Sequence, residues 1–372
     1  LIHEVAEPKK LIPTAKAMIK NGLKPVQPWD EKGFKLPGGK IWSPQGAQLW
    51  PAASAILRRE TQGNYPAAAA ILKCVFEGLQ VPFETGLKIE QRYFTHILQT
   101  PQARAMIRSL FISLQELNKG ARRPEGIKPV KLKKVGVVGA GFMGAGIAYV
   151  TAKAGIPVVL IDKDMDAANK GKAHSEGIVQ KGVQRGKTTK EAGEKLLSLI
   201  TPSSDYADLS DADLVIEAVF EDREVKKTVT EAIEAHIKPS AIFASNTSTL
   251  PITGLAKNSK RPKNFIGIHF FSPVDKMMLT EIILGRKTSD KALAVALDYV
   301  AAIKKTPIVV NDTRGFFVNR CVLRYMNESY NMLIEGVPPA MIENSARMAG
   351  MPVGPLSLND EVAIDLSLKI IR

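Results

Sequence analysis

The segment from Val135 to Asp162 constrains the fold of this chain most, because it contains the parts of a complete strand, turn, helix and second strand. The apolar run VGVV leads into glycines spaced G-x-G-x-x-G. Helix-compatible residues then lead to a second apolar run that ends on Asp162. A glycine turn between a strand and a helix is typical of proteins that bind dinucleotides on a parallel sheet. The segment therefore predicts a dinucleotide site.

Each glycine of this turn has its own physical role. Gly139 permits a tight turn, Gly141 has no Cβ to hold the backbone away from a pyrophosphate, and Gly144 lets the helix lie close to the sheet. Phe142 and Met143 lie between the last two glycines, where the helix begins and its free N–H groups would face the phosphates. We expect these five residues to bind the cofactor.

Asp162 indicates which dinucleotide binds. It lies 18 residues after Gly144, at the end of the second apolar run, where a carboxylate would bind the two ribose hydroxyls of NAD. Its charge would repel the 2′-phosphate of NADP, and no Arg follows it directly. The sequence thus predicts NAD as the cofactor. A glycine turn with a merely structural role is the alternative.

Composition argues against several classes of protein. The chain is 45% hydrophobic and 24% charged, which is ordinary for a globular protein, and it has no apolar run long enough to cross a bilayer. Cys74 and Cys321 are too few and too far apart for a disulfide framework or a metal cluster. We therefore expect no metal and a reducing compartment.

The net charge of +14 bears on the partners of the chain. Such a balance is compatible with nucleic acid, an anionic membrane surface or a polyanionic small molecule. No basic run is interleaved with stacking aromatic residues, which argues against nucleic acid. A solvated basic face and the steering of a phosphorylated ligand remain as interpretations.

Residues 1–130 contain short helical patterns separated by irregular sequence. The stretch over about residues 23–52 is rich in Pro, Gly and Trp, which is typical of an irregular linker. Helical patterns over residues 66–117 are expected to break near Pro82 and to bend at Pro101.

Residues 131–312 alternate between strand-like and helical patterns, with one long polar helical region that ends near Ser198. This alternation predicts an open, largely parallel sheet. Residues 313–372 show only helical patterns, with Gly336 and Gly350 as helix stops. The fold class is therefore α/β, a Rossmann-type NAD-binding domain with a helical C-terminal domain and an α-helical N-terminal linker segment.

A histidine at a strand end is the first catalytic candidate. His269 lies near the carboxyl end of the run FIGIHFF, where open α/β sheets place their ligands. After a turn, the run MMLTEIIL brings Glu281 back along an adjacent strand. A histidine held by a carboxylate is a general base, although a lone strand-end histidine is more often structural.

Four further polar residues are candidates for the site. Ser248 follows the run AIFA and Asn319 follows the Gly-containing turn in RGFFVNRC. Each could bind a substrate oxygen, or serve as a turn former or helix cap. Glu221 and Lys226 follow the run DLVIEAV, and they form a surface ion pair or contact the nicotinamide ribose or an acyl carrier's phosphates.

Five motifs give the chain from Lys134 onward its resemblance to the 3-hydroxyacyl-CoA dehydrogenase family: GAGFMGAGIA, VIEAVFED, FASNTSTLPI, HFFSPVDKMMLTEII and GFFVNRC. Their order and spacing are those of the family. The preceding segment resembles the tail of an enoyl-CoA hydratase domain and the linker helix of the multifunctional fatty-acid oxidation α-subunit. The hydratase core with its catalytic carboxylates is absent, so we expect no hydratase activity.

The resemblance implies a role for each candidate. His269 would be the catalytic base and Glu281 its partner. Ser248 and Asn319 would orient the substrate, and Asp162 would bind the adenosine ribose. The residues implied near the nicotinamide end are Glu221, Lys226 and Asn246.

Two departures from the family pattern matter. Ser272 stands where single-function enzymes usually have Asn and multifunctional α-subunits often have Ser. This supports the interpretation that the chain is part of a longer, multifunctional protein, and it leaves the role of Ser272 open. The chain ends at Arg372, short of a full C-terminal helical domain. We therefore expect closure over the acyl chain and the usual dimer contact to be incomplete.

The implied reaction is the NAD-dependent oxidation of an L-3-hydroxyacyl-CoA to the 3-ketoacyl-CoA in fatty-acid β-oxidation. The partners implied are the acyl-CoA substrate, a thiolase subunit and a second copy of the full-length chain. The compartment implied is the bacterial cytoplasm, with the mitochondrion or the peroxisome as alternatives. Two other functions stay open: a dehydrogenase of a free 3-hydroxy acid and a non-catalytic NAD-binding fragment.

Overall fold

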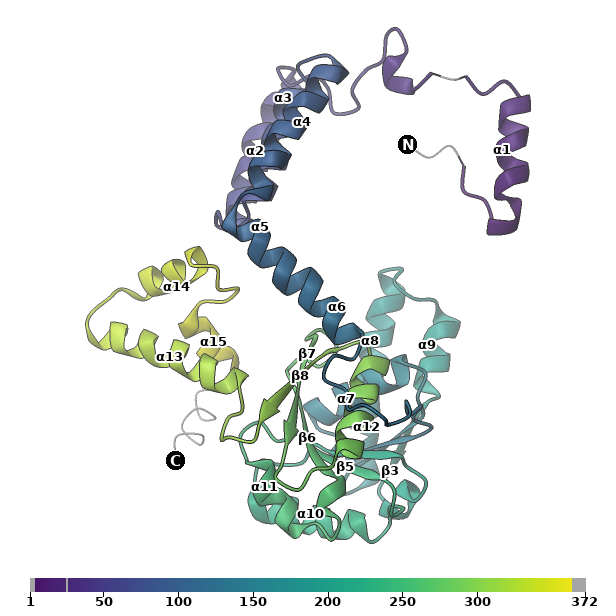
Figure 1. Ribbon diagram of the computed structural model, residues 1–372, viewed down its shortest axis with the longest axis vertical. Helices are drawn as coiled ribbons and strands as arrows, with labels where there is room; N and C mark the ends of the chain where they lie inside the picture. The colour runs from purple at the N-terminus through teal and green to yellow at the C-terminus, as the bar shows by residue number, and fades with distance from the viewer. Residues whose placement is uncertain (1–3, 25, 363–372) are drawn as a thin grey trace. The chain divides into compact units, whose positions relative to one another are not determined.

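The computed structural model describes residues 4–24 and 26–362 (Figure 1). Its contacts divide the chain into two compact units, Leu1–Arg104 and Ala105–Arg372. The second unit contains the whole sheet and the helices that follow it.

The first unit is helical, with α1 (Leu11–Lys20), α2 (Pro44–Thr61), α3 (Pro66–Gly78) and α4 (Phe83–Leu98). The irregular linker expected over residues 23–52 is wrong in its last part, because Ser43 caps α2 and Pro44 occupies its first turn, where a missing N–H costs nothing. The break expected near Pro82 is confirmed. Helix α4 ends at Leu98 and α5 (Pro101–Met106) begins at Pro101, so a break replaces the expected bend.

The second unit begins with a π-helical turn (Ile107–Ile112) and α6 (Ser113–Asn118), and its centre is an eight-stranded sheet. The strands are β1 (Val135–Val138), β2 (Val158–Ile161), β3 (Ile200–Ser203), β4 (Leu214–Glu217), β5 (Ile242–Ser245), β6 (Phe265–Phe270), β7 (Leu279–Leu284) and β8 (Thr306–Asn311). Their order is β3-β2-β1-β4-β5-β6-β7-β8, and the described pairings are parallel except that between β6 and β7. The expected open, largely parallel sheet is confirmed.

Helices cover both faces of this sheet (Figure 1). They are α7 (Phe142–Lys153), α8 (Met165–Gln184), α9 (Lys190–Leu197), α10 (Arg223–Glu234), α11 (Ile252–Leu255) and α12 (Asp290–Ala302). Successive strand residues face opposite sides. Val137 therefore belongs to the buried cluster that includes residues of α7, α8 and α12, while Val138 belongs to the cluster that includes residues of α10 and α11. Burial on both faces explains why the strands are almost continuously apolar.

Two details depart from the sequence expectation. The polar region after Asp162 is two helices rather than one, because Gly186 has a positive φ of 64° between α8 and α9. Strand β3 was not predicted, and it contains Pro202. The proline is tolerated because β3 is an edge strand, whose outer side needs no ladder hydrogen bond.

The described part of the segment after β8 is helical, as expected, with α13 (Val318–Ile334), α14 (Pro339–Met348) and α15 (Pro355–Val362). Residues 363–372 of that prediction lie outside the described residues. Gly336 and Gly350 have φ values of 89° and 101°, and each follows a helix end, so both predicted stops are confirmed. Met326 of α13 and Ile342 of α14 are buried.

Gly144→Ala should destabilise the protein, because a Cβ there would lie 1.7 Å from the carbonyl oxygen of Gly139. Overpacking of this kind costs roughly 1–3 kcal/mol or more. The measurement is thermal unfolding followed by circular dichroism. Gly177→Ala in α8 is the control, since a Cβ there meets nothing within 4 Å. An unchanged midpoint for Gly144→Ala would contradict the prediction.

Candidate active site

The glycines of the turn between β1 and α7 differ in whether the fold itself requires them. Gly139 has a φ of 96°, and a Cβ on it would meet the carbonyl oxygen of Ala218 at 2.6 Å. Gly141 differs, because its φ of −64° suits any residue and a Cβ would meet nothing within 4 Å. The fold itself therefore does not require glycine at 141, which is consistent with close approach of a ligand to the start of α7.

Asp162 lies directly against this turn. Its carboxylate accepts hydrogen bonds from the backbone N–H of Ala140 at 2.6 Å and of Lys163 at 2.7 Å. The carboxylate thus sits at the carboxyl ends of β1 and β2, beside the start of α7. Phe142 is 55% exposed and its ring packs edge-on against His174.

A cavity of about 340 Å³ opens at the carboxyl ends of β4, β5 and β6. Its walls combine apolar side chains with a few polar groups, as small-molecule sites usually do. The residues that line it are Met143, Ala218, Val219, Glu221, Asn246, Ser248, His269, Phe270, Phe271, Ser272, Asn319, Val322, Leu323 and Met326. Six residues that the sequence singled out for binding or catalysis therefore share one cavity with Ser272: Met143, Glu221, Asn246, Ser248, His269 and Asn319.

His269 and Glu281 form a buried pair behind this cavity. They are direct partners in the antiparallel register of β6 and β7, and His269 Nδ1 lies 2.7 Å from Glu281 Oε2. His269 is 5% exposed and Glu281 0%. Because Nδ1 is occupied by the carboxylate, Nε2 is the ring nitrogen that can exchange a proton with a ligand.

Glu281 also holds the start of α13. Its Oε1 accepts the backbone N–H of Phe317 at 3.0 Å and of Val318 at 2.9 Å. Burial alone would raise the pKa of Glu281, but these bonds and the one with His269 outweigh burial and bring the pKa below its ordinary value. The carboxylate is therefore ionised and able to stabilise a protonated His269.

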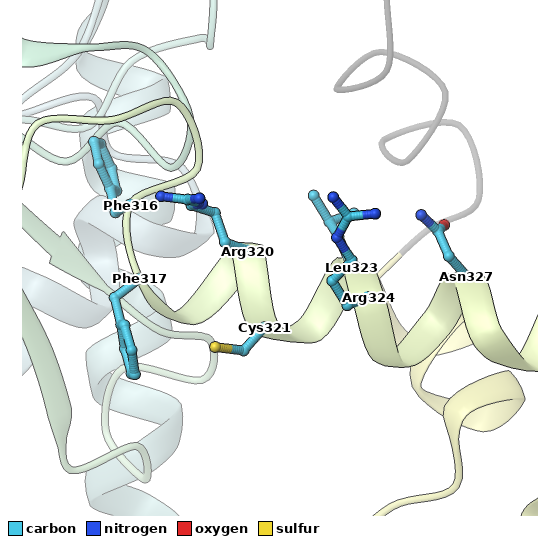
Figure 2. Close-up of a pocket in the computed structure, with 7 residues that line it drawn as sticks. All are labelled: Phe316, Phe317, Arg320, Cys321, Leu323, Arg324 and Asn327. Carbon is cyan, nitrogen blue, oxygen red and sulfur yellow. The ribbon is translucent and has the colours of Figure 1, made fainter.

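The turn before α13 directs these two amides. Gly315 and Phe316 have φ values of 74° and 51°, so the chain passes through two left-handed residues. Figure 2 shows the rings of Phe316 and Phe317 pointing to opposite sides of the chain. Phe316 is 2% exposed, with its ring 5.8 Å from that of His269. The turn thus places one aromatic ring beside His269 and supplies Glu281 with two backbone N–H donors.

Glu221 organises the loop that carries Ser248. Its Oε1 accepts hydrogen bonds from Thr247 Oγ1 at 2.7 Å, from the Ser248 N–H at 2.9 Å and from the Thr249 N–H at 3.0 Å. Burial would raise the pKa of Glu221, and the charge of Lys226 together with these donors lowers it below the ordinary value.

The side chains of Asn319 and Asn246 form hydrogen bonds with the backbone around the cavity. Asn319 Nδ2 donates to the carbonyl oxygen of Ser248 at 2.8 Å, which joins α13 to the loop after β5. Asn246 Oδ1 accepts the N–H of Phe270 at 2.9 Å.

Lys226 does not lie on the surface, so the surface ion pair considered from the sequence is wrong. Its side chain is 2% exposed, and its Nζ bonds both oxygens of Glu217 at 3.0 and 2.9 Å. Glu221 Oε2 lies 3.5 Å from the same Nζ. Lys226 is not among the described residues that line the cavity, because its ammonium group is enclosed by carboxylates.

Sequence reasoning missed Glu217. Burial raises its pKa, while Lys226 and a hydrogen bond from Ser245 Oγ oppose that shift. An acidic residue inside the apolar run DLVIEAV was the available signal, because a carboxylate buried in a strand needs a partner.

Comparison with known proteins identifies the family. The family model for the 3-hydroxyacyl-CoA dehydrogenase NAD binding domain matches residues 134–313, and that for the 3-hydroxyacyl-CoA dehydrogenase C-terminal domain matches residues 315–372. The chain belongs to the 3-hydroxyacyl-CoA dehydrogenase family. This confirms the resemblance seen in the motifs, the Rossmann-type fold, NAD as the cofactor of the family and the class of oxidoreductase.

Solved structures of this family share the fold. The chain is 36% identical to (S)-3-hydroxybutyryl-CoA dehydrogenase from Ralstonia eutropha, with a TM-score of 0.63 and coverage of 64% of this chain and 86% of that one. It is 34% identical to 3-hydroxybutyryl-CoA dehydrogenase from Escherichia coli K12, with a TM-score of 0.63 and coverage of 65% and 52%.

Curated relatives are longer. The fatty acid oxidation complex subunit alpha of Shewanella baltica is 40% identical over 323 residues, which are 87% of this chain and 46% of the relative. That of Shewanella amazonensis is 39% identical over 373 aligned positions, covering 100% and 52%. This dehydrogenase chain thus spans about half the length of the curated relatives it matches. Among its described residues, no helix is both long and apolar enough to span a membrane.

Glu281→Gln should change how the stability of this dehydrogenase chain depends on pH. The folded pKa of Glu281 is lowered, so its stabilising effect is present above the unfolded value of about 4.3 and is lost as pH falls through the folded value. Urea titrations should show the wild-type advantage over E281Q at pH 7 and its progressive loss below about pH 4. A difference that is constant with pH would argue against an ionised Glu281.

Gly141→Ala should weaken NADH binding by at least about tenfold while the thermal midpoint stays at the wild-type value, because the new methyl group meets no protein atom. NADH fluorescence titration measures the affinity. Gly177→Ala is again the matched control. Wild-type affinity in G141A would show that no ligand approaches this glycine.

Proposed function

We propose that this chain oxidises an L-3-hydroxyacyl-CoA to the 3-ketoacyl-CoA with NAD⁺. The observation that carries the proposal is the buried pair of His269 and Glu281, whose histidine lines a cavity that is also lined by Met143 from the glycine turn. NAD⁺ bound at this turn would supply the hydride acceptor. The polar groups around the cavity would then orient the hydroxyl group of the substrate and remove its proton.

Each side chain has one task in this reaction. His269 takes the proton of the substrate hydroxyl on Nε2. Bound NAD⁺ would accept the C3 hydride, so that the C–O bond becomes a carbonyl. Ionised Glu281 stabilises the resulting imidazolium. Ser248 and Asn319 line the cavity and hold the substrate oxygen in line, and Asn319 Nδ2 donates to the backbone carbonyl oxygen of Ser248.

The cofactor residues have separate parts. Asp162 binds the adenosine ribose, and the glycine turn with Phe142 and Met143 receives the pyrophosphate. Glu221 and Asn246, which line the cavity, would lie at the nicotinamide end. For Lys226, burial supports an indirect role in which its ammonium group holds Glu221 and the loop of Ser248 in place.

We also propose a place for the chain in a larger assembly. The names of the bacterial relatives support membership in a fatty acid oxidation complex. An acyl-CoA substrate, a thiolase subunit as partner, self-association of the full-length chain and a cytoplasmic location would go with that membership. Residues 1–130 would be the end of a hydratase-like domain and its linker. Residues 131–312 would be the NAD-binding domain and residues 313–372 part of the helical dehydrogenase domain, in keeping with the family matches.

NADH absorbance with 3-hydroxyacyl-CoA of several chain lengths, run beside a free 3-hydroxy acid and an NADH titration, tests the proposal. Turnover of the thioesters and not of the acid is expected. Turnover of both would favour a free-acid dehydrogenase. Binding of NADH without turnover would identify a non-catalytic fragment.

His269→Gln should lower kcat on the order of 10²- to 10⁴-fold, the usual contribution of a general base, while NADH still binds. His236→Gln, an exposed histidine after α10, is the control and should keep full turnover. Steady-state kinetics and the NADH titration provide both readings. Near-normal turnover in H269Q would remove His269 from the mechanism.

A further inference from the structure

The loop over residues 271–278 forms one wall of the proposed active site. It joins β6 to β7 and carries Phe271 and Ser272, which line the cavity. The ring of Phe271 lies 4.5 Å from the ring of His269. The position of this loop therefore decides what surrounds the catalytic histidine.

A buried lysine from another part of the chain binds this loop. Lys305 lies between α12 and β8, is 7% exposed, and donates from Nζ to the carbonyl oxygens of Val274, at 2.6 Å, and Met277. Its own backbone N–H donates to the carbonyl oxygen of Val300 at 3.0 Å, so the lysine is fixed to the end of α12.

The hydrogen bonds within the loop and the hydrogen bonds from Lys305 have different effects on the loop. Within the loop, the N–H groups of Lys276 and Met277 donate to the carbonyl oxygen of Pro273, which sets its local shape. The bonds from Lys305 set its position against the sheet, because they come from a different element. Charge-assisted bonds are roughly twice as strong as neutral ones.

A lysine at position 305 is costly to bury. Burial lowers the pKa of Lys305, so its charged form is costly there, and an apolar residue could fill the same space without that cost. The neighbouring Lys304 is exposed. The ammonium group of Lys305 donates to two carbonyl oxygens of this loop and interacts with the charge of Asp275 in the same loop, so it holds the loop in place.

We propose that Lys305 is a positioning residue for the dehydrogenase reaction: it holds the 271–278 loop so that Phe271 and Ser272 stay in place beside His269. This inference rests on the proposed function, because the loop matters to catalysis only if His269 does.

The test compares Lys305→Met, Lys305→Arg and Lys304→Met with the wild-type chain. K305M should lower kcat/KM for the acyl-CoA by about 10- to 100-fold, the usual effect of a small misplacement in an active site. Its NADH affinity should stay within about twofold, because the described hydrogen bonds of Lys305 go to Val274, Met277 and Val300 and not to the glycine turn. K305R should recover most of the activity, since it can donate to both carbonyls, and K304M should match the wild type.

Hydrogen exchange gives a reading that does not depend on activity. Amides within residues 274–278 should exchange faster in K305M than in the wild type and K304M. Wild-type kcat/KM in folded K305M, or unchanged exchange in the loop, would overturn the proposal. An equal loss of NADH affinity would also overturn it, because it would indicate general disruption. If K305M does not fold, K305Q takes its place. A wild-type chain without turnover would refute the proposed function, whereas exchange would still decide whether Lys305 holds the loop.

Discussion

The site depends on one carboxylate. Glu281 accepts from His269 with one oxygen and from the amides of Phe317 and Val318 with the other. A buried carboxylate is costly unless its charge is met by donors, and here three donors meet it. The orientation of the catalytic histidine and the start of α13 therefore depend on the same ionised group. The sheet and the C-terminal helices cannot be separated without leaving that charge unsatisfied.

Two features of the backbone make this convergence possible. The reversal between β6 and β7 sets Glu281 opposite His269 in the antiparallel register, whereas a parallel crossover would have needed a much longer connection. The left-handed Phe316 costs about 1–3 kcal/mol. Burial of its ring contributes about 1.5–3 kcal/mol, which offsets that cost. The strained backbone at Phe316 thus lies where it directs the two amide N–H groups at the carboxylate of Glu281.

The sequence predicted the parts of the site that follow from local pattern. Strand runs, their carboxyl ends and a short turn were enough to place His269, Glu281 and Ser248 at one edge of the sheet. Burial could not be predicted in the same way for Lys226, because a lysine after a strand is usually exposed. Its enclosure by Glu217 and Glu221 arises only when β4 and α10 pack together.

The sequence by itself determined the glycine turn, the acidic residue after it, the alternating strands and helices, and the helix stops, because backbone sterics and side-chain periodicity act over a few residues. The tertiary structure decided which donors each carboxylate receives, where β3 joins the edge of the sheet, and that Lys305 binds carbonyls about 30 residues before it. Those outcomes join segments far apart in the chain. Their geometry is set by packing of the whole unit, which no local pattern contains.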